Sequence, residues 1–184
     1  MTPEEAWKLV QEAEELVGEK QVQAAVIRLA REITVDFSKS FPLILCVMNG
    51  GIVVTGHLLP KLLFPLTLGY VHATRYQEGT EGGNIQWLAP PPGEVAGREV
   101  LVVDDILDEG DTLWAIVERC RAMGAKRVAS CVLAEKILKH PKRIKADFTG
   151  LALPERYVFG FGMDAYGLWR NLPRLMALEE KARG

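Results

Sequence analysis

The sequence predicts an α/β protein with a mostly parallel, twisted sheet flanked by helices. Two continuous apolar runs, 43–48 and 100–103, each lead through a short turn into an apolar-periodic helix. Such runs are typical of strands buried on both faces, and strand–helix alternation gives parallel strands with right-handed crossovers. The 184 residues suffice for one domain with a full core. We therefore expect one domain over 1–184, with N-terminal helices in 1–38, a core in 41–135 and a C-terminal segment in 136–184.

The N-terminal part predicts two helices. The first is expected over 2–17, because Thr2 can cap it, Pro3 suits its first position and Gly18 stops it. The second is expected over 20–37, where apolar residues recur at helical spacing. We expect both helices to cover the sheet.

The rest of the chain continues the alternation. Gly124 marks a helix end, and glycine-rich polar residues at 77–84 are unable to pack. The expected elements are a strand at 43–48, a helix from 52, strands at 66–76, 85–88 and 100–103, a helix at 112–123, a strand at 127–133, and short strand-like pieces at 146–151 and 156–161. The last two pieces are expected to form a lid over the carboxyl edge of the sheet.

Charge and cysteine content narrow the class of protein. A net charge of −2 favours neither a nucleic-acid nor a membrane partner. The three separated cysteines, Cys46, Cys120 and Cys131, favour reduced, buried thiols over a disulfide framework or a zinc site. There is no signal-peptide pattern and no apolar run of about 18 residues. These features predict a cytoplasmic protein.

The most informative stretch is 100–113. Its apolar run meets Asp104 and Asp105 where the strand is expected to end, which is where open α/β sheets bind ligands. Neighbours in an extended strand point to opposite faces, but at its end both carboxylates can reach a sugar diol or the water shell of Mg²⁺. The alternative is a solvated strand end or a helix cap.

The following loop suits a phosphate. Gly110 and Thr112 allow close backbone approach and a hydroxyl donor at a helix start, whereas Glu109 and Asp111 must turn outward if amides bind the anion. Asp108 is a candidate general acid/base or a simple turn residue. The lysine-containing P-loop motif is absent.

Three other features admit two interpretations. The Asn49-Gly50-Gly51 turn could face an anion or be an ordinary tight turn. The alternating aromatics Tyr157, Phe159 and Phe161 predict one strand face, either core or a surface for a flat heterocycle. A basic run could be a solvated loop or attract a polyanion. It consists of Lys136, Lys139, His140, Lys142, Arg143 and Lys145.

Together these pieces resemble the hypoxanthine-guanine phosphoribosyltransferase family of type I phosphoribosyltransferases. Residues 100–113 resemble its phosphoribosyl-pyrophosphate signature, 48–51 its pyrophosphate loop, and 76–84 its mobile flap. Lys136 with 146–148 and 154–164 resembles its purine-binding hood. Four separated motifs occur in the family's order, over about 41–178.

The resemblance implies a site in three parts. Asp108 would act as acid/base beside purine N7, Asp164 would join Asp104 and Asp105 at Mg²⁺, and Asn49 and Gly50 would meet pyrophosphate through a cis peptide. The implied substrate-binding residues are Asn49, Gly50, Arg75, Tyr76, Asp104, Asp105, Glu109, Gly110, Asp111, Thr112, Lys136, Arg156, Tyr157, Val158 and Arg170. Among them, Lys136 would donate to the 6-oxo group, Tyr157 would stack on the base and the Val158 backbone would read its edge.

The implied reaction makes IMP or GMP from hypoxanthine or guanine and 5-phosphoribosyl 1-pyrophosphate, in a homodimer or homotetramer. Glu109, Arg156 and Arg75 depart from residues common in the family, which leaves their contributions open. The alternatives are a xanthine-preferring sibling enzyme, a nucleotide-sensing regulator of the same fold, and a phosphoacceptor domain. The regulator would need a basic face, and the phosphoacceptor would lack the flap and hood.

Overall fold

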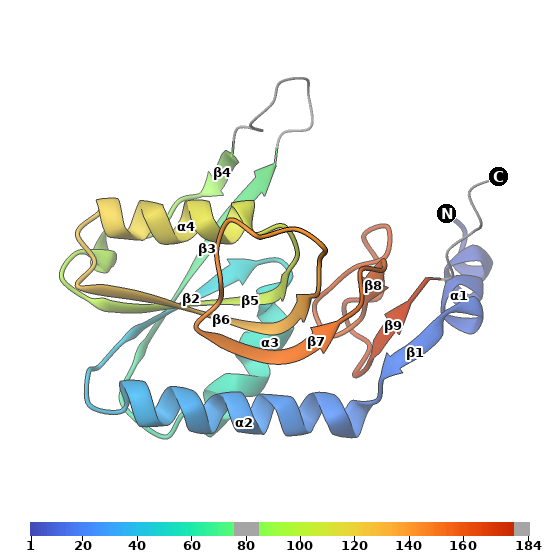
Figure 1. The fold of residues 1–184 in the computed structure, drawn as a ribbon, viewed down its shortest axis with the longest axis horizontal. Coiled ribbons are helices and arrows are strands. Elements are labelled where there is room, and N and C mark those ends of the chain that lie inside the picture. The colour runs from blue at the N-terminus through green and yellow to red at the C-terminus, as the bar shows by residue number, and fades with distance from the viewer. Residues whose placement is uncertain (76–84, 179–184) are drawn as a thin grey trace.

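The computed structural model describes residues 1–75 and 85–178, with the Arg75 side chain outside the description. Its centre is a six-stranded sheet in the order β4-β3-β2-β5-β6-β7, parallel except where β4 pairs with β3 (Figure 1). The strands are β2 (Leu43–Met48), β3 (Thr67–Arg75), β4 (Ile85–Ala89), β5 (Glu99–Leu107), β6 (Arg127–Lys136) and β7 (Phe148–Leu153). This confirms the predicted fold class.

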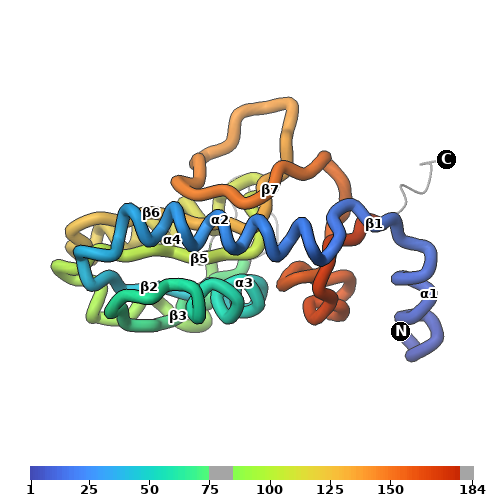
Figure 2. Tube along the Cα trace, turned by 90° about the horizontal axis from the view of Figure 1, so that it is seen from below, coloured from blue at the N-terminus to red at the C-terminus, as the bar shows by residue number. Residues whose placement is uncertain are grey.

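Helices cover both faces of this sheet. Figure 1 shows α2 (Glu19–Phe37) and α3 (Gly51–Leu58) below the sheet and α4 (Asp111–Ala122) above it, and Figure 2, seen from below, shows α2 running along the near face beside α3. Short 3₁₀ turns lie at Leu59–Lys61 and Gly93–Val95. After β2 the chain adds β3 on one side, and it later returns to add β5 on the other. The order therefore reverses between β2 and β5, and such a switch point leaves a crevice at the carboxyl ends of the strands.

The N-terminal segment differs from the prediction. Thr2 caps the helix α1 (Pro3–Glu12) as expected, in a capping box with Glu5, but the helix ends five residues early. The next residues form β1 (Glu14–Val17), which pairs antiparallel with β9 (Leu175–Ala177). Pairing with a distant strand supplies backbone partners that local helical periodicity does not reveal.

A second, small sheet carries the C-terminal hood, defined as residues 154–178. Its order is β1-β9-β8, with β8 at Val158–Phe159. The helix α1 packs beside this hood, where Trp7 meets Trp169 edge-on at 5.1 Å between ring centroids. The prediction that both N-terminal helices cover the main sheet is therefore wrong for α1 and right for α2.

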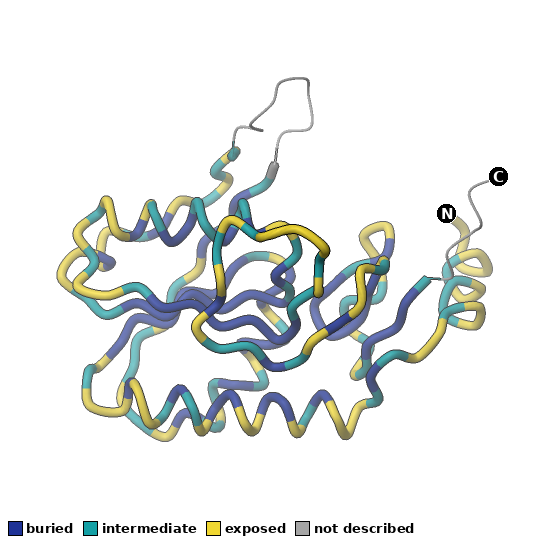
Figure 3. The backbone as a smooth tube through the Cα atoms, viewed as in Figure 1, coloured by how far each residue is buried: buried dark blue, intermediate teal, exposed yellow. Residues whose placement is uncertain are grey.

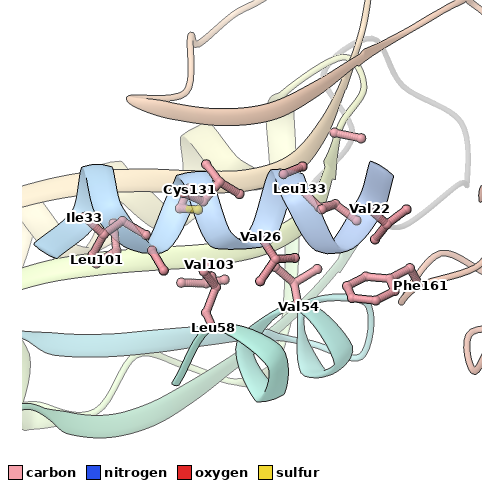
Figure 4. Close-up of a cluster of buried hydrophobic side chains, with 14 of the residues drawn as sticks. Val22, Val26, Ile33, Val54, Leu58, Leu101, Val103, Cys131, Leu133 and Phe161 are labelled. Atoms are coloured by element: carbon pink, nitrogen blue, oxygen red, sulfur yellow. The ribbon is translucent and has the colours of Figure 1, made fainter. Parts of the chain in front are cut away.

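The core lies on both faces of the main sheet (Figure 3). Figure 4 shows the cluster between α2, α3 and the strands, where Val26 and Val54 lie near Phe161 from the hood. One cluster thus joins the main sheet to the hood. Buried residues from both sheets therefore exclude water together.

All three cysteines are buried and free, as predicted. Burial raises the pKa of Cys120 to about 11. None of the helices in the described part of the chain is long and apolar enough to cross a membrane.

The predicted aromatic face around β8 is wrong. Phe159 and Phe161 are buried in two different clusters, while Tyr157 is about half exposed at 48%. The strand stops at Phe159, and positive φ angles at Gly160 and Phe161 turn the chain. Side chains alternate between the two faces of a strand only while the backbone stays extended.

Candidate active site

A cavity of about 340 Å³ opens at the carboxyl ends of β2 and β5. It collects residues from the end of β2, from β5 and the loop after it, and from the hood. The predicted residues that line it are Asn49, Gly50, Asp104, Asp105, Asp108, Glu109, Gly110, Asp111, Thr112 and Arg170. Residues up to 121 positions apart in sequence therefore share one cavity, because parallel strands bring their carboxyl ends to the same edge.

Asp104 and Asp105 form a buried acidic pair in this cavity. They lie inside β5 and not at its end as predicted, because pairing with β6 continues to Leu107. Burial and then the charge of Asp105 raise the pKa of Asp104 well above its usual range. Burial also raises the pKa of Asp105, although hydrogen bonds, including one from the Ile106 amide, oppose the shift. The raised pKa values show that burial disfavours the two negative charges. A divalent cation or hydroxyl donors bound between these carboxylates would stabilise them.

The turn after β2 lies directly against this pair. The Met48–Asn49 peptide bond is cis, in the loop where the family resemblance implies one. A Cβ added to Gly50 would collide with the carboxylate of Asp105, so only glycine lets this turn approach so closely. Gly162 of the hood packs in turn against the Gly50 carbonyl. The turn after β2, the strand β5 and the hood thus meet at Gly50, although they are distant in sequence.

Arg170 brings a cation to the same cavity. Its guanidinium donates to the Gly162 carbonyl over 2.6 Å and pairs with Asp164 at 2.5 Å. Asp164 also accepts from the Gly167 amide at 2.8 Å. In the described residues no three His, Cys, Asp or Glu side chains gather as a metal site, so Asp164 does not join the acidic pair in one cluster. The residues that fit Mg²⁺ are therefore Asp104 and Asp105, with other ligands left to substrate oxygens and water.

The phosphate loop, residues 108–112, ends at a helix N-terminus. Gly110 has a φ of 91° and is the N-cap of α4, where it accepts from the Trp114 amide at 2.8 Å. The first amides of α4 have no partner within the helix and suit an anion. Glu109 contacts His140 and Asp111 pairs with Arg143, so both carboxylates have cationic partners.

Lys136 lies at the end of β6 beside the phosphate loop. Its ammonium donates to Oδ2 of Asp108 over 2.6 Å. Lys136 lines a neighbouring cavity formed by residues 135–145 rather than the main one. Asp108 and Lys136, which are both predicted to touch the base, are therefore in contact with each other.

The hood residues predicted to hold the base lie outside the lining of this cavity. Tyr157 stacks on Tyr166, with 6.1 Å between ring centroids and 17° between planes. The Arg156 guanidinium contacts Glu14 and the Leu178 carbonyl, and Val158 is buried in β8. None of Arg156, Tyr157 and Val158 is among the described residues that line the main cavity. Their contacts with a base stay predictions, and so do those of Arg75 and Tyr76, whose side chains lie outside the described residues together with the flap.

Sequence reasoning missed the partners that organise these groups. His140 and Arg143 were interpreted as part of a solvated or anion-attracting run, yet both pair with the phosphate loop. The paired residues are 31 and 32 positions apart in the chain, and the charge pattern of the sequence does not show which of them meet. Tyr166 and Gly162 had no local signal, because their roles come from contacts across the fold.

Comparisons with known proteins agree with this geometry. A family model for the phosphoribosyl transferase domain matches residues 12–166. The hypoxanthine-guanine phosphoribosyltransferase of Bacillus subtilis is 30% identical over 165 residues, covering 89% of this chain and 92% of the relative. The hypoxanthine-guanine-xanthine enzyme of Tritrichomonas foetus is 29% identical, covering 90% and 91%. A solved hypoxanthine phosphoribosyltransferase from Staphylococcus aureus has the same fold, with a TM-score of 0.87 at 23% identity over 96% of this chain and 97% of that one.

The family model covers most of the chain, and the bacterial relative is matched over almost its whole length. On this basis the chain belongs to the hypoxanthine-guanine phosphoribosyltransferase family.

Proposed function

We propose that this protein transfers the 5-phosphoribosyl group of 5-phosphoribosyl 1-pyrophosphate to N9 of hypoxanthine or guanine, releasing pyrophosphate and forming IMP or GMP. The observation that carries this proposal is the cavity that joins a buried acidic pair, a close-packed glycine turn and a phosphate loop at the α4 N-terminus. It offers separate positions for a ribose, a pyrophosphate and a 5′-phosphate.

The reaction breaks the bond from ribose C1 to the pyrophosphate oxygen and forms a bond from C1 to purine N9. Positive charge develops at the sugar, so the buried carboxylates of Asp104 and Asp105 stabilise the transition state while they orient the ribose hydroxyls. A bound Mg²⁺ supplies charge neutralisation for the departing pyrophosphate. In this proposal Arg170 and the Asn49–Gly50 turn, which line the same cavity, meet that leaving group.

The base is held on the other side of the phosphate loop. Asp108 takes or returns the proton at purine N7, and Lys136 donates to the 6-oxo group. Their direct contact supports a shared site for the five- and six-membered rings. Tyr157 supplies an exposed aromatic face for stacking, and the Val158 backbone reads the base edge. Closure of the flap over 77–84 would exclude water from the activated sugar.

A xanthine-preferring enzyme is the second candidate, because the Tritrichomonas foetus relative bears xanthine in its name. A regulator that binds nucleotide and RNA is less well supported, given a net charge of −2 and the presence of Asp108. We further propose a cytoplasmic homodimer or homotetramer that acts as one domain over 1–184.

The test is a steady-state assay of the purified protein with 5-phosphoribosyl 1-pyrophosphate, Mg²⁺ and hypoxanthine, guanine, xanthine or adenine, one at a time. We expect pyrophosphate release with hypoxanthine and guanine. Turnover highest with xanthine would establish the second candidate, and no turnover with any 6-oxopurine would refute the proposal. Adenine is the matched control, because it lacks the oxo group that Lys136 would recognise.

A further inference from the structure

The phosphate loop of this chain holds two carboxylates where a dianionic 5′-phosphate is proposed to bind. Glu109 and Asp111 flank Gly110, and the first amides of α4 follow at once. Negative side chains this close to a phosphate oppose its binding unless cations engage them. The structure must therefore direct both carboxylates to other partners.

A basic segment, residues 137–145, lies against this loop. Lys142 anchors the segment, because its ammonium donates to the Leu107 carbonyl at 3.1 Å and to Glu135 at 3.1 Å, and only 9% of its side chain is exposed. At Gly110, an added Cβ would lie 3.1 Å from Cγ2 of Ile144. The segment is thus fixed to the ends of β5 and β6 and packs on the phosphate loop itself.

From this position the segment provides a nitrogen donor for each carboxylate. His140 donates from Nε2 to Oε2 of Glu109 over 2.9 Å. Arg143 lies 3.7 Å from Asp111, and its guanidinium stacks 3.4 Å from the centre of the Trp114 ring. Among the described residues that line the main cavity, neither His140 nor Arg143 appears. Both donors therefore approach the loop from outside the proposed phosphate position.

We propose that His140 is a positioning residue for 5′-phosphate binding, which holds the Glu109 carboxylate toward the basic segment and leaves the α4 amides to meet the phosphate. Arg143 does the same for Asp111. The inference rests on the proposed function, since it assigns a role within that site. The Glu109 hydrogen bond raises the pKa of His140, which favours the cationic form in this contact.

This role predicts a specific kinetic signature for His140→Ala. The released carboxylate repels the phosphate, so KM for 5-phosphoribosyl 1-pyrophosphate should rise about three- to ten-fold. The turnover number should stay as it is, because His140 contacts Glu109 and none of the groups proposed to act at the reacting atoms. The KM for the base should change less than the KM for 5-phosphoribosyl 1-pyrophosphate. His140→Lys keeps a cation and should restore most of the affinity.

The decisive comparison removes the carboxylate. In a Glu109→Gln background there is no charge to hold, so adding His140→Ala should leave KM unchanged. Lys139→Ala is the matched control, because it removes a positive charge from the same segment and the described residues give Lys139 no hydrogen bond or ion pair. Calorimetric titration with ribose 5-phosphate measures the same site without turnover, and thermal unfolding checks that each variant is folded.

Three outcomes would overturn the inference: an unchanged KM in His140→Ala, an equal rise in Lys139→Ala, or a His140→Ala defect that persists with Glu109→Gln. An equal rise of KM in Lys139→Ala would indicate that the basic segment attracts the phosphate at long range and does not position Glu109. If the unsubstituted protein shows no turnover, the proposed function fails, and the ribose 5-phosphate titration still decides the role of His140. If the unsubstituted protein shows no turnover and binds no ribose 5-phosphate, the proposed function and the role of His140 are both overturned.

Discussion

Lys136 donates a hydrogen bond from Nζ to Oδ2 of Asp108 over 2.6 Å, which joins the ends of two neighbouring strands beside the phosphate loop. The Lys136 side chain is largely buried in this contact, whereas Asp108 is about half exposed. In the proposed reaction these two groups meet N7 and the 6-oxo group, which lie on the same edge of one purine. Their contact sets the distance between them before a base arrives, which is a form of preorganisation.

Asp108→Asn tests the acid/base role. The amide keeps the size of the side chain but holds no proton for exchange, so kcat should fall by about 10²-fold or more. Binding of 5-phosphoribosyl 1-pyrophosphate should stay nearly intact, as measured by calorimetry. Asp36→Asn is the matched control on the far surface, where Asp36 pairs with Arg127, and it should leave kcat unchanged. An unaltered rate in Asp108→Asn would remove Asp108 from the mechanism.

Lys136→Gln tests recognition of the 6-oxo group. Hydrogen bonds from a charged donor contribute about 1.5–3 kcal/mol, so KM for hypoxanthine should rise by about 10-fold or more. The KM for 5-phosphoribosyl 1-pyrophosphate should change much less, because Lys136 lies outside the lining of the main cavity as described. Equal losses for both substrates would show that Lys136 supports the fold of the site and does not read the base.

Gly50→Ala tests the close approach of the β2 turn to Asp105. An added Cβ would collide with the Asp105 carboxylate, and both segments are held by β-sheet pairing, so the turn must move. We expect kcat/KM for 5-phosphoribosyl 1-pyrophosphate to fall by about 10²-fold and the free energy of unfolding to fall by about 1–3 kcal/mol.

Gly56→Ala is the matched control for that variant. Gly56 lies in α3 and its added Cβ would meet nothing within 4 Å. Alanine has the higher helix propensity, so this change should stabilise the protein by about 0.5–1 kcal/mol without loss of activity. Urea denaturation and the steady-state assay measure both variants. Full activity in Gly50→Ala would show that the turn tolerates displacement.

Asp104→Asn tests the cost of burying the acidic pair. Because the pKa of Asp104 lies well above 3.8, the unfolded chain loses this proton at lower pH than the folded protein does. The free energy of unfolding therefore falls as pH rises from about 4 through the raised pKa. The neutral amide removes that loss, so the variant should be more stable than the unsubstituted protein at about pH 7.

The stability gain of Asp104→Asn should shrink as pH falls and disappear below about 4, where the carboxyl group becomes protonated in both states. Urea denaturation across this range measures it, and the assay should show strongly reduced turnover. A gain that is the same at every pH would contradict the proposed electrostatic cause. A destabilised variant at neutral pH would show that Asp104 serves the fold as much as the site.

Local sequence patterns were sufficient for most of the central sheet. The β2 strand, the α2 helix and the start of α4 lie within one residue of their predictions, because buried strands and capped amphipathic helices have strong local signals. Local sequence patterns failed where pairing with a distant strand decides the structure. Residues 14–17 continue a helical pattern but form β1, since β9 offers them backbone partners.

The residue types of the site, and their order along the chain, were determined by the sequence alone. Two adjacent aspartates, a glycine-containing acidic loop and an Asn-Gly-Gly turn are local features that carry chemistry wherever they fold. What only the tertiary structure decided is which groups meet: Gly50 with Asp105, Lys136 with Asp108, and His140 with Glu109. Such contacts depend on strand order and on the path of segments far apart in the chain. No local pattern specifies them, because their energies arise only when the sheet and the hood pack together.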